Sequence, residues 1–160
     1  MKTKDIFSRA FMVPLIIASA LFITSCSKDS NNNNNSTMYS ISGNASGSQE
    51  TPSNTVTGTG TLSGTYNSST NVLNYTITWT GLTGLVTVAH FHGPANAGVS
   101  ASPIIDITIS TNGISGTVTG SATLDATTES YLLNGKIYYN LHTATYPAGE
   151  IRGQITAVAQ

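Results

Sequence analysis

The chain has 160 residues, with six Lys and Arg, seven Asp and Glu, and a formal net charge of −1. Charged residues make up 8% of the sequence, and its few basic residues form no patch. This composition excludes a protein that binds nucleic acid or anionic lipid headgroups through clustered positive charge.

The N-terminal segment has the pattern of a secretory signal peptide. Three basic residues lie within the first nine positions, and an apolar run over 10–23 follows them. The run is long enough for a signal peptide but shorter than the roughly 20 residues that cross a bilayer. The sequence Ile23-Thr24-Ser25-Cys26 then resembles a lipobox, in which the cysteine is acylated and becomes the new N-terminus. We therefore predict a lipoprotein signal peptide over residues 1–25 and lipidation of Cys26.

Residues 26–37 predict a flexible tether between this anchor and a folded domain. After Cys26 the segment contains only Ser, Lys, Asp, Asn and Thr, so it buries no apolar surface that would offset the entropy of ordering. Ser27 follows the cysteine in place of an acidic residue that would resemble an inner-membrane retention signal. The expected location is therefore the cell envelope, on the outer membrane, with the periplasmic and surface faces both open.

Residues 38–160 are expected to form one domain that folds without disulfide bonds. Cys26 is the only cysteine, which leaves no thiol for a disulfide, a thiolate metal site or a nucleophile. Removal of residues 1–25 leaves three basic and six acidic residues, a net charge of −3. A domain of this length buries enough surface to fold on its core alone.

The domain is predicted to be all-β. Residues 56–62, 72–80 and 104–110 alternate apolar side chains with Thr or Ser, and no stretch after residue 25 shows apolar residues at helical spacing. The pairs Asn112-Gly113 and Asn134-Gly135 predict turns between strands. We expect about seven to nine antiparallel strands in a sandwich or flattened barrel, similar to immunoglobulin or superoxide dismutase folds.

The three histidines of the chain fall in two short segments, AHFHGPA and NLHT. Residues two apart on a strand project to the same face, about 6.5–7 Å apart. We therefore expect His90 and His92 to point together, with Ala89 and Phe91 facing the core. By the same alternation, His142 and Asn140 share the face of their strand opposite Tyr139 and Leu141, so His142 need not be a core residue.

These two segments, the second followed by PAGEIRGQI, resemble the paired signature of the chordin-domain (CHRD) family. The resemblance runs from about Met38 to Ala159. The family is an all-β extracellular or surface module without a settled biochemical activity. The resemblance therefore implies a non-catalytic binding domain outside the cytoplasm, with an extracellular protein or a glycan as its partner.

The histidines also suggest a metal site. His90 and His92 can converge on one ion, and His142 from a neighbouring strand completes a three-nitrogen site for copper or zinc. The arrangement is similar in outline to that of Cu/Zn superoxide dismutases, but the chain lacks their disulfide, a fourth copper histidine and the zinc loop, so dismutase activity is not expected. The alternative is that the three imidazoles only form structural hydrogen bonds.

Glu150 and Arg152 share one face of the last predicted strand, while Ile151 packs inward. Their simplest interpretation is an exposed ion pair that contributes about 0–1 kcal/mol. The alternative for Glu150 is that it orients His142 through the second ring nitrogen, or ligates the metal directly. For Arg152 we favour a structural role.

No motif of an enzyme class is present. The sequence has no Gly-x-Ser-x-Gly elbow, no paired carboxylates and no phosphate-binding loop. Two hypotheses remain for a membrane-anchored lipoprotein of the cell envelope. One is a non-catalytic CHRD-like binding domain, and the other is a copper or zinc binding module for metal handling or redox protection.

Overall fold

Nine β-strands carry the fold of residues 37–160, the part of the chain that the computed structural model describes. They are β1 (Met38–Ser46), β2 (Thr59–Asn67), β3 (Val72–Thr80), β4 (Val86–His92), β5 (Pro103–Ile107), β6 (Gly116–Thr123), β7 (Tyr138–Thr143), β8 (Ile151–Gln154) and β9 (Thr156–Ala159). All paired strands are antiparallel, which confirms the predicted all-β class. The predicted signal peptide, the lipidation site at Cys26 and the tether up to residue 36 lie outside the described residues.

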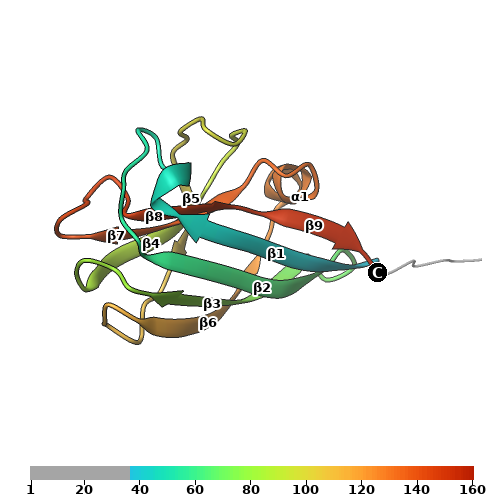
Figure 1. The fold of residues 1–160 in the computed structure, drawn as a ribbon. Helices are drawn as coiled ribbons and strands as arrows, with labels where there is room; N and C mark the ends of the chain where they lie inside the picture. The colour runs from blue at the N-terminus through green and yellow to red at the C-terminus, as the bar shows by residue number, and fades with distance from the viewer. Residues whose placement is uncertain (1–36) are drawn as a thin grey trace, which may run out of the picture. The chain divides into compact units, whose positions relative to one another are not determined.

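The strands form one nearly closed, barrel-like sheet (Figure 1). Its order is β5-β4-β7-β8-β1-β2-β3-β6, and β9 pairs with β1 beyond Ile155, where β8 has ended. The two edge strands, β5 and β6, are joined by residues 108–115. Asn112-Gly113 lies in this connection, between two strands that do not pair with each other.

β3 shows why the alternating pattern predicts this fold correctly. Its bounds are those of the predicted strand, and Leu73, Ile77 and Trp79 are buried in the core. The intervening Thr76 and Thr78 face outward and hydrogen-bond to threonines of β6, at 3.2 and 3.1 Å. Hydroxyl groups therefore supply the solvent-facing polarity that charged residues supply in most sheets.

Two other predicted strands match only in part. β2 starts at Thr59, because its partner β3 ends opposite at Thr80, and it continues past the predicted end at residue 62. β5 ends at Ile107, the last residue paired with β4. Strand pairing, which a single sequence does not display, sets these bounds.

Two helices were not predicted: a 3-10 turn, η1 (Gly47–Gln49), and one α-helix, α1 (Ala126–Leu133). Asp125 caps α1, since its carboxylate accepts a hydrogen bond from the Thr128 amide at 2.7 Å. The α-helix ends at Leu133, Asn134 is its C-cap, and Gly135 follows with φ +65°. This pair therefore forms a turn, but between a helix and β7 and not between two strands as predicted. Only Leu132 of α1 is buried, which explains why no apolar stripe marks the helix. No helix within residues 37–160 has the length and apolar character needed to cross a bilayer.

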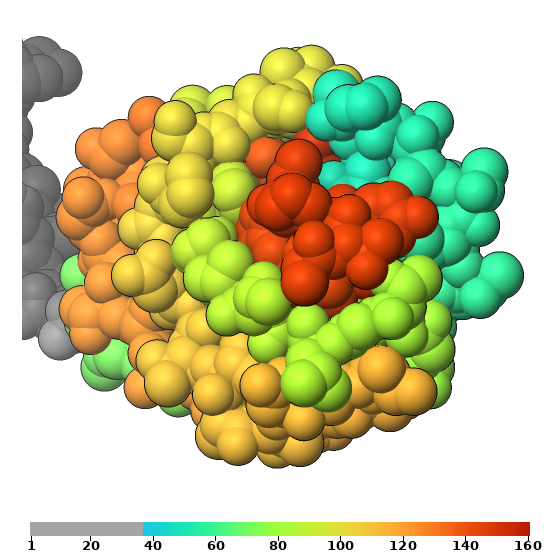
Figure 2. Space-filling view, turned by 90° about the vertical axis from the view of Figure 1, so that its left-hand side faces the viewer, coloured from blue at the N-terminus to red at the C-terminus, as the bar shows by residue number. Residues whose placement is uncertain are grey.

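Loops cover the outward face of the strands around β7. All six residues of β7 are buried, although alternate side chains point away from the core. Figure 2 shows the 144–150 loop (red-orange) between the segment around residue 50 (cyan) and the segment around residue 100 (yellow). The fold therefore has a second buried layer, which is polar, and the histidines belong to it.

Candidate metal centre

The histidines are placed by the register of β4 and β7. Ala89 and Phe91 are buried in the core, as predicted, so His90 and His92 project from the opposite face of β4. On the neighbouring strand, His142 pairs with Val88 in register and lies on the same face as the other two histidines. His90 and His142, which are 52 positions apart along the chain, are thus brought together.

The three imidazoles form one cluster. One ring nitrogen from each lies within 4.8 Å of the others, and this is the group of potential metal ligands found among residues 37–160. His90 Nδ1 and His142 Nε2 are 3.4 Å apart. Two nitrogens bound to one zinc or copper ion at about 2 Å are about 3.3–3.5 Å apart, so this pair already has the spacing of two ligands.

The second nitrogen of each ring has a partner outside the cluster. His92 Nδ1 donates to the carbonyl of Ala101 at 2.9 Å, and His142 Nδ1 donates to the carbonyl of Pro147 at 3.1 Å. Because a carbonyl only accepts, both rings carry their hydrogen on Nδ1 when neutral, and their Nε2 lone pairs face inward. His90 Nε2 lies 3.6 Å from the carboxylate of Asp106. Metal-binding histidines are typically held by such outer contacts.

Burial favours the neutral, metal-binding form of two of the rings. His92 and His142 are 6% and 7% exposed, and burial lowers the pKa of each below the usual histidine range. The side chain of His90 is 17% exposed and forms the solvent-facing side of the cluster. An ion would therefore reach the centre past His90.

Hydrogen bonding alone leaves one buried nitrogen of the histidine cluster unsatisfied. His142 Nε2 lies 3.4 Å from His90 Nδ1, whereas His92 Nε2 is buried and has no hydrogen-bond partner. A buried polar atom without a partner costs about 1–3 kcal/mol. A metal ion between the three rings would give this atom a partner, whereas the alternative of purely structural histidines does not.

The structure places Glu150 and Arg152 differently from the expected exposed ion pair. Both are buried, at 0% and 2% exposure, and they make no ion pair with each other. Glu150 accepts hydrogen bonds from the Thr83 amide, the Thr83 hydroxyl and the Thr143 hydroxyl, at 2.6, 2.9 and 2.6 Å. The nitrogen of His142 that Glu150 was expected to orient is held by Pro147 instead.

Arg152 takes part in a stack that the sequence did not indicate. Its guanidinium carbon lies 3.5 Å from the ring centre of Tyr138, and the Tyr138 ring is stacked on His92. The alternation of Arg152 with Ile151 correctly indicates that Arg152 points away from the core. It does not indicate that loops cover this outward face and bury the side chain.

A buried acid lies beside this stack. Glu50 accepts a hydrogen bond from the Asn140 amide at 3.3 Å, and its other carboxylate oxygen has no hydrogen-bond partner. Burial raises the pKa of Glu50 to about 7, although the Arg152 charge and the Asn140 hydrogen bond act in the opposite direction. Glu50 thus titrates near neutral pH in the same polar layer as the histidines.

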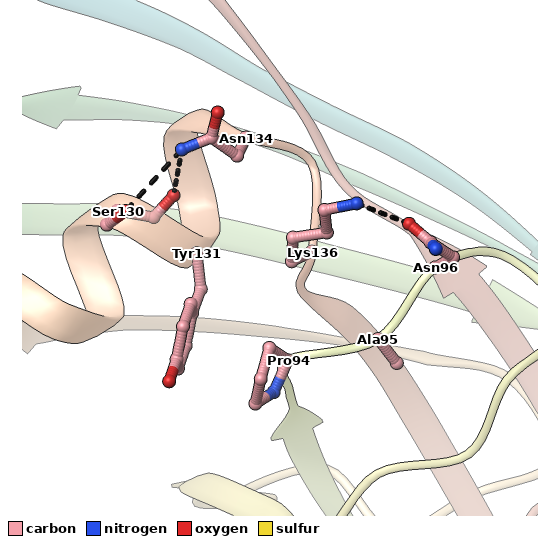
Figure 3. Close-up of a pocket in the computed structure, with 7 residues that line it drawn as sticks. All are labelled: Pro94, Ala95, Asn96, Ser130, Tyr131, Asn134 and Lys136. Carbon is pink, nitrogen blue, oxygen red and sulfur yellow. Dashed lines mark hydrogen bonds between the residues drawn. The ribbon is translucent and has the colours of Figure 1, made fainter.

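A separate hollow of about 390 Å³ lies beside α1 (Figure 3). Tyr131 and Pro94 give it apolar walls, and its polar groups bond to one another: Lys136 to Asn96, and Asn134 to Ser130. None of the predicted site residues lines it. With its polar groups paired, this hollow gives no comparable indication of a ligand.

Fold and site together define a class: an antiparallel, barrel-like β domain with a three-histidine cluster in a loop-covered polar layer. Residues 41–155 match the family model of the CHRD domain, so the chain belongs to the CHRD domain family. The matched region contains all three histidines and Glu150, and the family supports a binding-type domain. Comparisons with curated proteins and with solved structures give no match.

Proposed function

We propose that this protein is a lipoprotein of the cell envelope whose CHRD domain binds one copper or zinc ion through His90, His92 and His142. Two observations carry the proposal: one ring nitrogen from each of the three histidines lies within 4.8 Å of the others, and His92 Nε2 is buried without a hydrogen-bond partner. The domain acts as a binding module rather than as an enzyme.

The chemistry of the donor set supports copper or zinc. Imidazole nitrogen suits both ions, whereas calcium and magnesium require oxygen ligands. Three nitrogens leave a fourth position, which water or a ligand of the partner would fill on the exposed side of His90. This arrangement suits reversible metal handling at the envelope, because the open position allows a second molecule to take over the ion.

The N-terminal sequence supports the anchor. The basic start, the apolar run and Ile23-Thr24-Ser25-Cys26 suit export followed by acylation of Cys26. Ser27 favours transfer to the outer membrane over retention at the inner one. The 26–37 tether would then hold the metal-binding domain away from the lipid surface.

Metal titration tests the proposal directly. We expect the purified protein to bind one Cu(II) or Zn(II) ion per chain in calorimetry, with a Kd below about 1 μM. The variant with alanine at all three histidines should lose this binding. Asn44→Ala, an exposed polar substitution on β1, is the matched control and should bind as the wild type does. Equal binding by the wild type and the triple variant would refute the metal centre.

A further inference from the structure

Three planar groups from three neighbouring strands are stacked next to the metal centre. The guanidinium of Arg152 on β8 lies over the Tyr138 ring on β7, at 3.5 Å from its centre. The Tyr138 ring is parallel to that of His92 on β4, with 4.8 Å between centres and 6° between planes. His92 and Tyr138 are paired in register, so the sheet itself brings the rings face to face.

The hydroxyl of Tyr138 holds the group that orients His92. It donates to the Ala101 carbonyl at 3.2 Å and accepts from the Ala101 amide at 3.1 Å. The same carbonyl accepts the hydrogen bond from His92 Nδ1. Tyr138 therefore fixes the plane of the His92 ring by stacking and fixes its rotation through Ala101.

Arg152 stacks on the Tyr138 ring and also hydrogen-bonds to the loop that contains Ala101. It donates to the carbonyl of Asn96, which belongs to the same 93–102 loop as Ala101, and to the side chains of Thr51 and Gln154. At 2% exposure it is fully packed, and a planar guanidinium can stack on a ring while it donates in its own plane. Arg152 therefore contacts both the 93–102 loop, through a hydrogen bond, and the Tyr138 ring, through stacking.

We infer that Tyr138 and Arg152 are positioning residues of the metal centre, which hold His92 Nε2 toward the ion before the ion arrives. The inference rests on the proposed function, since it assigns a role toward the same three-histidine site. A ligand that is already oriented loses little conformational freedom on binding, so the stack increases metal affinity. Substitution of residues that hold metal ligands typically weakens binding 10- to 100-fold.

Substitutions at Tyr138 separate stacking from hydrogen bonding. We expect Tyr138→Leu to weaken Zn(II) and Cu(II) binding by about 10- to 100-fold, and Tyr138→Phe, which keeps the stack, to have a smaller effect. Arg152→Lys keeps the charge but loses the planar stack, and it should also weaken binding. Tyr131→Leu, the same change on α1 outside the stack, should leave the affinity unchanged.

A double-mutant cycle tests whether Tyr138 acts through His92. In a His92→Ala background, Tyr138→Leu should cause little further loss of affinity, because the ring that it positions is gone. An equal loss in both backgrounds would overturn the inference and indicate a general effect on stability. Should Tyr138→Leu fail to fold, Tyr138→Phe and Arg152→Lys replace it in the cycle.

Nitrogen NMR of the metal-free protein gives a second, independent readout. We expect one Nδ1-protonated form of His92 in the wild type and a mixture of both tautomers in Tyr138→Leu. A folded Tyr138→Leu variant with wild-type affinity and a single tautomer would overturn the inference. If the wild type binds no metal, the proposed function fails, and the tautomer comparison still decides whether Tyr138 orients His92.

Discussion

The hydroxyl of Thr143 donates to the carboxylate of Glu150 at 2.6 Å and closes the loop between β7 and β8 at its base. Thr143 directly follows His142, and the enclosed loop supplies the Pro147 carbonyl that accepts from His142 Nδ1. Glu150 therefore supports the three-histidine cluster through the loop rather than by touching a histidine. This relationship replaces the direct contact expected from the sequence.

Glu150→Gln should lower the free energy of unfolding by about 2–4 kcal/mol, because the buried carboxylate accepts three hydrogen bonds and an amide has one acceptor oxygen. Urea denaturation of the metal-free protein measures this loss. Metal affinity should fall far less than in His142→Ala. A loss of affinity as large as that of His142→Ala would place Glu150 in direct contact with the bound ion.

Gly149→Ala should destabilise the protein by about 2–4 kcal/mol. A methyl group there would collide with the side chains of Asn140 and Glu50, and the φ of +131° disfavours any residue but glycine. Gly98→Ala is the control, since Gly98 also has a positive φ but has no atom within 4 Å of the added carbon. Thermal denaturation should show a clearly larger loss at Gly149. Equal losses would contradict the packing around Asn140.

Glu50 should make stability depend on pH near neutrality. Its pKa is raised from 4.5 to about 7, so the folded protein holds the proton more tightly than the unfolded chain. The resulting stabilisation is complete below about pH 4.5 and is lost as the pH rises through 7. Relative to Glu50→Gln, the wild type should lose about 1–3 kcal/mol between these limits.

Urea denaturation at several pH values from 4.5 to 8 checks the Glu50 prediction. Both proteins keep the histidines, so their titration cancels in the difference between the two. A difference that stays constant over this range would show that Glu50 has an ordinary pKa.

Cys26→Ala should abolish acylation. The lipobox interpretation makes this cysteine the acceptor of the lipid, so the variant should be released from the membrane fraction or mislocalised. Metabolic labelling with palmitate measures the modification directly. Incorporation of label into the variant would refute an anchor at Cys26, while leaving the metal centre untouched.

The sequence alone predicts the part of the site that depends on strand alternation. Ala89 and Phe91 are apolar, so the face that His90 and His92 share followed directly. His142 joined them because its own strand alternates in the same way. The all-β fold was equally predictable, since most strands have one apolar and one hydroxyl-rich face.

The residues that support the histidines could not be predicted in the same way. Alternation places Glu150 and Arg152 on the outward face of the last predicted strand, and only the loops that fold over this face bury them. Nothing in the sequence distinguishes Tyr138 from the other aromatic residues, and only the strand register places it opposite His92. The helix α1 gave no signal because it buries a single side chain, Leu132.

The origin of the three ligands on β4 and β7 has a consequence for the whole domain. Neither strand can leave the sheet without releasing a bound ion, and the two are separated by 52 positions from His90 to His142. In a domain without cysteine, copper or zinc would therefore act as a removable cross-link. The resistance of the domain to proteases would then depend on the supply of metal.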